Sequence, residues 1–197
     1  MQSTEINLAL LPLSANVFPG GRMQLRIFEP RYIRMVKESL QEARGFAICM
    51  LNPKGDTAGN QHIFPIGTAV SIIDFESLAD GTLGITVAGS NLVEIKSITA
   101  ESDDLKTAQA ILLTPWSSHI TKTDIEKAVL SDRLREVYAA YPDVAELYKE
   151  TYFDDIGWLC ARWLELLPLE PDVKQNLLAS HSPRKISNYI YKLFEQL

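Results

Sequence analysis

The side chains best suited to acid–base or nucleophilic chemistry lie far apart in this sequence. Its three histidines, His62, His119 and His181, are isolated from one another, and its two cysteines, Cys49 and Cys160, lie inside separate apolar runs. Any of these histidines could act as a base toward a distant serine or cysteine, although isolated loop histidines are more often simply solvated. No CxxC or Cys/His ligand spacing occurs, so the pattern favours buried, reduced thiols over a metal or redox site.

Recognisable catalytic and phosphate-binding motifs are absent from the sequence. It contains neither a GxGxxG nor a GxxxxGK[ST] glycine loop, and it contains no GxSxG hydrolase elbow. Two pairs of adjacent carboxylates occur, at 103–104 and 154–155, but adjacent side chains of a helix do not face each other. Asp155 fits a helix cap instead. We therefore predict no catalytic residue, no metal and no cofactor, while an uncharacterised enzyme stays an alternative.

One segment differs in charge from the rest of the chain. Between Arg22 and Arg44 there are six basic and three acidic residues, a local charge of +3, whereas the whole chain carries −6. This segment could form a basic patch for an acidic partner, or it could be the solvated face of one helix and one strand. The acidic whole disfavours nucleic-acid binding, because a negatively charged protein repels phosphate backbones on average.

A run of aromatic side chains is the second surface candidate. Five occur within 16 residues: Tyr138, Tyr141, Tyr148, Tyr152 and Phe153. Aromatic side chains give much contact area at low entropic cost, and they are enriched in recognition surfaces. The alternative is that most of them fill the junction between a sheet and a helical part. We take Tyr148, Tyr152 and Phe153 as candidate binding residues.

The elements that must position these residues change character near residue 116. Nine of the ten glycines precede Trp116, and only Gly157 follows it. Glycine is common in tight turns between short strands and is unfavourable inside helices. The sequence therefore predicts a β-rich subdomain over residues 1–116 and a helical bundle subdomain over residues 117–197.

Strand patterns fill the first part. Residues 23–27 alternate between apolar and polar, and Phe46–Leu51 is a continuous apolar run typical of a fully buried strand. Further strands are predicted at 67–75, 82–88, 92–99 and 107–113, with turns at 79–81 and 88–91. Five or six short strands joined by tight turns predict an antiparallel sheet that curls toward a barrel.

Helical periodicity predicts the remaining elements. One helix begins at Pro30, ends by Gly45 and covers the sheet with an apolar face formed by Ile33, Val36, Leu40 and Ala43. In the second part, helix caps are predicted at Thr123, Asp155 and Ser182, and prolines 142, 168 and 171 limit the other helices. The chain is thus predicted to be α+β, with a sheet, one covering helix and a C-terminal bundle.

Composition places the chain among ordinary globular proteins. It has 197 residues, of which 46% are hydrophobic and 22% charged, so it can bury a core without disulfide staples. The N-terminus has no basic segment followed by a long apolar run, and no apolar run approaches the roughly 20 residues of a membrane span. These features predict a cytoplasmic protein with no membrane contact.

Three motifs in order resemble one known family. They are Leu10–Leu13, Val17–Gly20 and Ile27–Tyr32, and the last two are fairly specific at this spacing. Together with Leu166–Leu169 they resemble the Lon N-terminal domain family, the substrate-binding domain of Lon proteases, which is also found alone in small bacterial proteins and within cereblon. The motif residues that carry the resemblance are Phe18, Pro19, Gly20, Phe28, Glu29, Pro30, Arg31 and Tyr32.

The resemblance implies a fold and a role. The family has a PUA-like β pseudobarrel followed by an α-helical bundle, and it binds unfolded or tagged polypeptide without catalysis in this domain. One departure is Gln24, where the family usually has proline, so the edge of the sheet is expected to pair differently here. Neither the ATPase nor the Ser–Lys protease region of Lon follows Leu197 in this sequence, so we expect no protease activity.

The motif residues also have physical roles. We expect Phe18-Pro19-Gly20-Gly21 to form a turn with an apolar anchor, Phe28 to pack beneath the helix, and Arg31 to reach a carboxylate or a carbonyl. These roles are architectural, so the motif residues are predicted to be structural.

The function predicted is a non-catalytic polypeptide-recognition module that acts as an adaptor or scaffold, in some cases with a separate protease or ATPase. The alternative is an RNA-binding or small-ligand-binding PUA-like protein, for which the basic segment is the only support in the sequence. Oligomeric state does not follow from these patterns.

Overall fold

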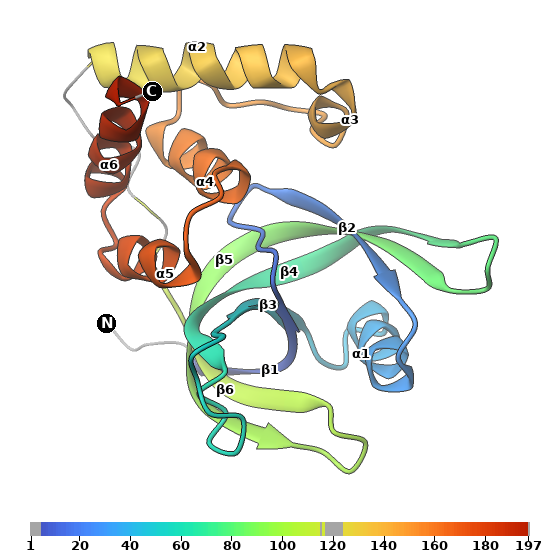
Figure 1. Ribbon diagram of the computed structural model, residues 1–197. Helices are drawn as coiled ribbons and strands as arrows, with labels where there is room; N and C mark the ends of the chain where they lie inside the picture. The colour runs from blue at the N-terminus through green and yellow to red at the C-terminus, as the bar shows by residue number, and fades with distance from the viewer. Residues whose placement is uncertain (1–4, 115, 117–123, 197) are drawn as a thin grey trace. The chain divides into compact units, whose positions relative to one another are not determined.

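The computed structural model describes residues 5–114, 116 and 124–196. The chain divides into two compact units, Met1–Pro115 and Trp116–Leu197. The described residues of the first unit form a curled sheet with one helix, and those of the second form helices alone (Figure 1). This architecture confirms the predicted α+β class.

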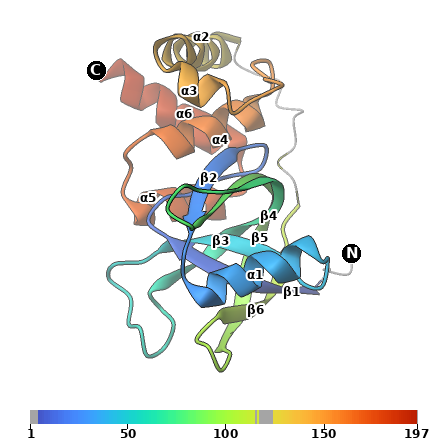
Figure 2. The ribbon, with the colours of Figure 1, turned by 90° about the vertical axis from the view of Figure 1, so that its right-hand side faces the viewer.

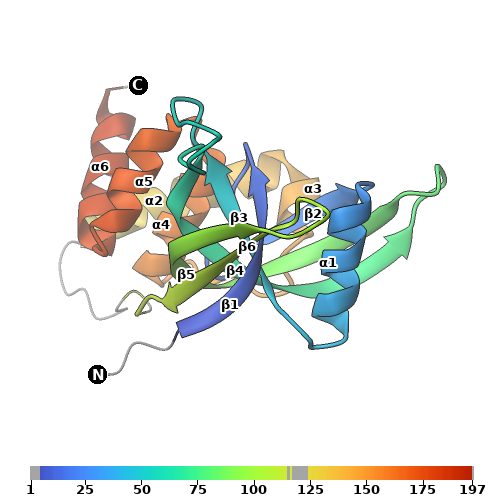
Figure 3. The same cartoon turned by 90° about the horizontal axis from the view of Figure 1, so that it is seen from below.

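Six strands build the sheet of the first unit. They are β1 (Glu5–Leu13), β2 (Arg22–Ile27), β3 (Phe46–Leu51), β4 (Ile63–Ser77), β5 (Leu83–Ala100) and β6 (Lys106–Leu112). Their order is β2-β5-β4-β3-β1-β6, and β5 also pairs with β6, so the sheet curls into a partly closed barrel (Figure 3). The pairs are antiparallel except for β1 and β3, which run parallel because the chain between them crosses over through β2 and a helix.

The long strand β5 corrects a sequence prediction. Residues 88–91 are not a turn between two strands, because β5 continues through them as one strand of 18 residues. Ser90 is the extra residue of a β-bulge, and its hydroxyl donates to the carbonyl of Ala69 at 2.8 Å. A bulge shifts the side-chain alternation by one residue. Consequently Val87 and Val93, both odd-numbered, belong to different core clusters.

Strands β1 and β3 are buried on both faces. The sequence patterns do not predict β1, whereas they predict β3 with the observed bounds. Along each of these strands, alternate side chains pack into two different core clusters, as expected for strands covered on both faces. One cluster contains Ala9, Leu11, Phe46 and Ile48, and the other contains Leu8, Leu10, Ala47 and Cys49.

The helix of the first unit, α1 (Pro30–Leu40), is shorter than predicted. It packs Met35 and Val36 into the first of these clusters and lies beside the curled sheet (Figures 1 and 2). Glu42 has a φ of 56° and ends the helical path, so Ala43 is not part of the helix. Leu40, in the last turn, is 46% exposed rather than buried as predicted.

Phe28 also departs from its predicted place. It is 65% exposed and does not pack beneath the helix. Successive strand residues point to opposite faces. Because Ile27, the last residue of β2, is buried in the core, the next side chain is directed away from it.

The second unit consists of helices. They are α2 (Asp124–Ala140), α3 (Pro142–Ala145), α4 (Ile156–Leu166), α5 (Pro171–Ala179) and α6 (Pro183–Glu195). Two predicted caps are confirmed: Asp155 accepts from the amide of Trp158 at 2.9 Å, and Ser182 accepts from the amide of Lys185 at 3.4 Å. The predicted cap at Thr123 lies outside the described residues.

Leucine and isoleucine side chains form most of the helical core. The fully buried ones are Leu130, Leu134, Leu159, Leu164, Leu178, Ile186 and Ile190. Trp163 ties α4 to α2, because its indole N–H donates to the carbonyl of Leu130 at 3.0 Å, and its ring meets that of Phe194 edge-on at 4.8 Å. Among the described helices, none has the length and apolar character needed to cross a membrane.

Candidate functional site

The histidines and cysteines do not form a catalytic cluster in the described part of the chain. His62 is half-buried and His181 is exposed, while His119 lies outside the described residues. Both thiols are free and buried, and burial raises the pKa of Cys49 to about 12, so it is not a thiolate at neutral pH. Residues 5–114, 116 and 124–196 contain no group of three His, Cys, Asp or Glu side chains placed to hold a metal ion.

The basic segment is tied into ion pairs. The guanidinium of Arg34 donates to both carboxylate oxygens of Asp103, at 2.9 and 2.8 Å, and it also pairs with Glu38 and Glu101. Arg44 pairs with the same two glutamates. Glu101 and Asp103, two of the three acidic residues between β5 and β6, therefore neutralise arginines that would otherwise be available to contact a phosphate backbone.

These ion pairs make an acid-dependent contribution to stability. The hydrogen bonds from Arg34 lower the pKa of Asp103 to about 2, and those from Arg44 and Arg34 lower the pKa of Glu101. A carboxyl whose pKa is depressed by folding stabilises the fold above its unfolded pKa, and this stabilisation is lost as the pH falls toward its folded pKa. For Asp103 the loss spans about pH 4 to pH 2.

Replacing Asp103 with asparagine tests this pH dependence. D103N is expected to melt at a lower temperature than the unmodified chain at pH 7, because it loses the charged acceptor of Arg34. The two melting temperatures are expected to converge as the pH falls from 4 toward 2. The measurement is thermal unfolding followed by circular dichroism across this range. A difference that stays constant with pH would show that the carboxylate charge is not what matters.

The residues of the family motif have structural partners. Gly20 has a φ of 77°, and its amide donates to the carbonyl of Gly89 at 2.9 Å, while the amide of Gly21 donates to the carbonyl of Phe18 at 2.8 Å. Phe18 is buried, as expected for the anchor of this turn. Arg31 pairs with Glu29 at 2.7 Å and donates to the carbonyl of Asp104 at 3.3 Å. The motif thus holds the turn at residues 18–21 against the β-bulge of β5. It also holds the start of α1 against the hairpin between β5 and β6.

The aromatic run packs around one tryptophan of the helical unit. The rings that meet Trp158 edge-on, at centroid distances of 5.5–6.5 Å, are those of Tyr138, Tyr148, Tyr152 and Phe153. Arg135 lies over the Phe153 ring, 3.9 Å from its centroid. The three predicted binding residues are therefore brought together. Only Tyr152 is largely exposed, at 52%, and Tyr141, at 62%, lies outside this set of ring contacts.

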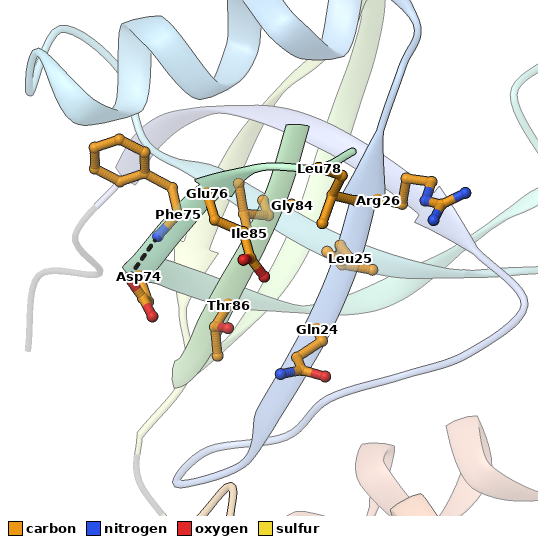
Figure 4. A pocket seen from close by; sticks show the side chains of 10 residues that line it. All are labelled: Gln24, Leu25, Arg26, Asp74, Phe75, Glu76, Leu78, Gly84, Ile85 and Thr86. Atoms are coloured by element: carbon orange, nitrogen blue, oxygen red, sulfur yellow. Dashed lines mark hydrogen bonds between the residues drawn. The ribbon is translucent and has the colours of Figure 1, made fainter. Parts of the chain in front are cut away.

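A surface pocket of about 280 Å³ lies on the first unit, over β2 and the paired strands β4 and β5 (Figure 4). Its wall combines charged and apolar side chains. The residues that line it are Gln24, Leu25, Arg26, Asp74, Phe75, Glu76, Leu78, Gly84, Ile85 and Thr86. The β4–β5 hairpin that carries most of them projects from the rest of the sheet (Figures 1 and 3).

Gly84 forms the floor of this pocket. It lies between Arg26 on β2 and Glu76 on β4, which are its register partners on either side. A Cβ atom at this position would lie 3.1 Å from Cγ of Glu76 and 3.2 Å from a methyl group of Leu78. The absence of a side chain at Gly84 therefore leaves the hollow between the two flanking strands.

Sequence reasoning missed this pocket. The alternation of residues 23–27 predicts β2, and the turn at 79–81 predicts the β4–β5 hairpin. The sequence therefore predicts each of the two elements that line the pocket, but not that they lie side by side. What the pattern lacks is the pairing of β2 with β5, which are separated by α1, β3 and β4. The one sequence signal for the pocket is Gly84, which lies inside a strand. A glycine inside a strand often marks a place where a ligand or another backbone comes close.

Solved structures with the same architecture define the class of fold. A Lon N-terminal domain protein from Xanthomonas campestris matches with a TM-score of 0.73 at 23% identity, covering 93% of this chain and 96% of that one. The N-terminal domain of a Mycobacterium avium complex Lon protease matches with a TM-score of 0.64 at 13% identity, covering 94% and 96%. At these identities the likeness shows the fold alone.

The family follows from the sequence comparison. The family model of the ATP-dependent protease La (Lon) substrate-binding domain matches residues 7–196. The chain therefore belongs to this family. The comparison with curated proteins found no match.

Proposed function

We propose that this chain is a non-catalytic polypeptide-recognition module that acts as an adaptor or scaffold. The observation that carries the proposal is the family match over residues 7–196, because the substrates of a protease are polypeptides. In this proposal the chain holds a polypeptide and presents it to a separate protease or ATPase. A cytoplasmic location and the identity of that partner stay predictions.

The pocket at Gly84 is the proposed primary contact. It offers apolar surface from Leu78 beside the charged groups of Arg26 and Glu76. Recognition sites commonly combine an apolar wall with a few polar groups that orient the ligand. The aromatic residues Tyr148, Tyr152 and Phe153 are the proposed second contact.

RNA binding is less well supported by the arrangement of charges. Arg34 and Arg44 each pair with two or more carboxylates. An RNA would have to displace these carboxylates before it could gain phosphate contacts, whereas affinity for nucleic acids depends mainly on such contacts.

A binding experiment with one protein in two states tests the proposal. Ribonuclease A that has been reduced and alkylated is unfolded, while native ribonuclease A has the same sequence and a stable fold. We expect this chain to bind the unfolded form in the micromolar range and the native form at least about 10-fold more weakly, as measured by fluorescence anisotropy. No binding of the unfolded form at about 100 μM would contradict the proposal.

The aromatic contact has its own matched test. Tyr152 and Tyr141 are both exposed tyrosines of the helical unit, but only Tyr152 belongs to the cluster around Trp158. Y152A is expected to weaken binding of unfolded ribonuclease A about 5-fold, whereas Y141A leaves it unchanged. Equal affinities for the two variants would remove the aromatic cluster from the proposed site and leave the pocket as its only contact.

A further inference from the structure

Strand β2 is paired on one side only. In the described sheet it is the terminal strand of the order β2-β5-β4-β3-β1-β6, and β5 is its single partner. Backbone amides and carbonyls along the other side of such a strand are available to pair with another extended chain. The question is which groups of β2 point outward.

Two hydrogen bonds answer this question. The amide of Gly89 donates to the carbonyl of Gly21 at 3.0 Å, toward β2, and the amide of Leu78 donates to the carbonyl of Thr82 at 2.9 Å, toward β4. Since antiparallel strands alternate their bonding direction residue by residue, odd-numbered residues of this part of β5 bond to β2 and even-numbered ones bond to β4.

The same alternation fixes the directions on β2. Because Met23 pairs with Val87 and Leu25 with Ile85, these two β2 residues bond to β5. The intervening residues Arg22, Gln24 and Arg26 consequently direct their N–H and C=O groups to the free side. Their side chains lie on the face away from the core, because the apolar side chains between them pack against it, and those of Gln24 and Arg26 are exposed.

Gln24 lies at the middle of this free edge. A proline at this position would have no N–H to donate. In this chain the backbone donor is present. The edge of β2 therefore carries an uninterrupted row of outward donors and acceptors at residues 22, 24 and 26.

The pocket beside this edge selects by charge. Arg26, on its rim, is paired with Asp80 at 3.1 Å. The other two charged residues of the lining, Asp74 and Glu76, have no basic partner among the described residues, and both are exposed. The pocket thus presents two uncompensated carboxylates beside the apolar side chain of Leu78, which suits the aliphatic stem and cationic end of lysine or arginine.

The distance from the edge also favours a long side chain. Neighbouring strands are about 4.8 Å apart, so a strand added to β2 would lie about 10 Å from Gly84 on β5. A lysine or arginine side chain is shorter than this distance, so it does not reach Gly84 itself. It can cross β2 and meet the carboxylate of Glu76, because Glu76 leans back over Gly84, with its Cγ 3.1 Å from where a Cβ of residue 84 would lie. Short side chains cannot cross β2.

We propose that an extended segment of a bound polypeptide adds to the sheet as a strand beside β2, and that a lysine or arginine of this segment enters the pocket toward Asp74 and Glu76. This inference rests on the proposed function and specifies how the polypeptide is held. Main-chain hydrogen bonds with Gln24 and its neighbours supply affinity, and the pocket supplies the preference for a basic side chain.

Paired variants of Gln24 separate the backbone from the side chain. Q24P removes the outward N–H without removing a bond to β5, whereas Q24A keeps the N–H and removes only the side chain. With unfolded ribonuclease A as the probe, we expect Q24P to weaken binding about 10-fold or more and Q24A less than about 2-fold. Thermal unfolding of both variants checks that the fold is intact.

Peptides test the pocket. Two short threonine- and valine-rich peptides differ only at their centre, which is lysine in one and norleucine in the other. We expect the lysine peptide to bind more tightly than the norleucine peptide. E76K is expected to abolish this preference, because it reverses the charge of one pocket carboxylate. E42K, at an exposed glutamate outside the pocket, is the control and is expected to leave the preference unchanged.

Other outcomes would overturn the inference. If the chain binds unfolded ribonuclease A but Q24P and Q24A bind it equally well, the proposed function stands and strand addition at β2 is wrong. If the chain binds no unfolded polypeptide, both fail. If sedimentation shows a dimer that Q24P dissociates, a second copy of this chain occupies the edge, and the inference is also wrong.

Discussion

Replacing Arg162 with alanine is expected to lower the free energy of unfolding by about 3–5 kcal/mol, one of the two largest effects that we predict for a single substitution. Arg162 lies on α4 with 1% of its surface exposed. Its Nε donates to one carboxylate oxygen of Glu165 at 2.6 Å, and its Nη2 donates to the other at 2.7 Å. The rings of Tyr148 and Trp158 lie 5.6 and 5.4 Å from its guanidinium carbon.

The expected loss is large because the substitution leaves a charge behind. Glu165 is largely buried, and without Arg162 its carboxylate keeps the cost of desolvation but loses a two-bond partner. Lys174 is also buried and interacts electrostatically with Glu165, so it compensates only in part. Desolvation lowers the pKa of Lys174, which shows that this lysine is itself poorly solvated.

A double variant distinguishes charge from packing. R162M/E165L removes both charges and keeps much of the apolar volume, so it is expected to recover most of the stability that R162A loses. R184A, at an exposed arginine of α6, is the control and is expected to change stability by less than about 0.5 kcal/mol. Urea unfolding provides the measurement. A loss below about 1 kcal/mol for R162A would show that the pair contributes little.

Replacing Gly89 with alanine is expected to lower the free energy of unfolding by about 2–3 kcal/mol. A Cβ atom at Gly89 would lie 2.2 Å from the carbonyl oxygen of Phe18 and 2.8 Å from its carbon, both backbone atoms. Backbone cannot rotate away as the end of a side chain can, so the turn at 18–21 or the bulge at Ser90 must move. Either movement strains the two hydrogen bonds that join Gly89 to Gly20 and Gly21.

Gly59 offers the matched control for this substitution. An alanine Cβ there would have its nearest neighbour at 3.6 Å, an ordinary contact with the side chain of Gln61. G59A is expected to change stability by less than about 1 kcal/mol. Equal unfolding midpoints for G89A and G59A in urea would contradict the role assigned to Gly89 and, with it, the structural role of the family motif.

Local patterns predicted much of the fold. The apolar run at 46–51, the caps at Asp155 and Ser182 and the start of α1 at Pro30 follow from chemistry within a few residues, and the structure confirms them. The sequence predicts a turn at Gly89 because glycine suits turns, whereas the structure shows that the close passage of the Phe18 backbone is what requires a glycine there. The predicted division into a β-rich subdomain over 1–116 and a helical bundle subdomain over 117–197 stays a prediction.

The candidate site was harder to predict because distant pairings create it. The basic segment could not be recognised as neutralised from its own residues, since Glu101 and Asp103 are 57 to 69 residues away from the arginines that they bind. The pocket likewise needs β2 and the hairpin side by side. Charge complementarity and hollows of this kind depend on strand order, which sequence periodicity does not encode.

Hydrogen–deuterium exchange with and without unfolded ribonuclease A tests the central claim, polypeptide recognition by this chain at the β2 edge, most directly. Exchange reports each backbone amide separately, so it locates the contact as well as detecting it. We predict slower exchange at Gln24 and at the other outward amides of β2, with no change at those of α6. Unchanged exchange throughout the chain at saturating polypeptide, or protection confined to the helices, would contradict the account.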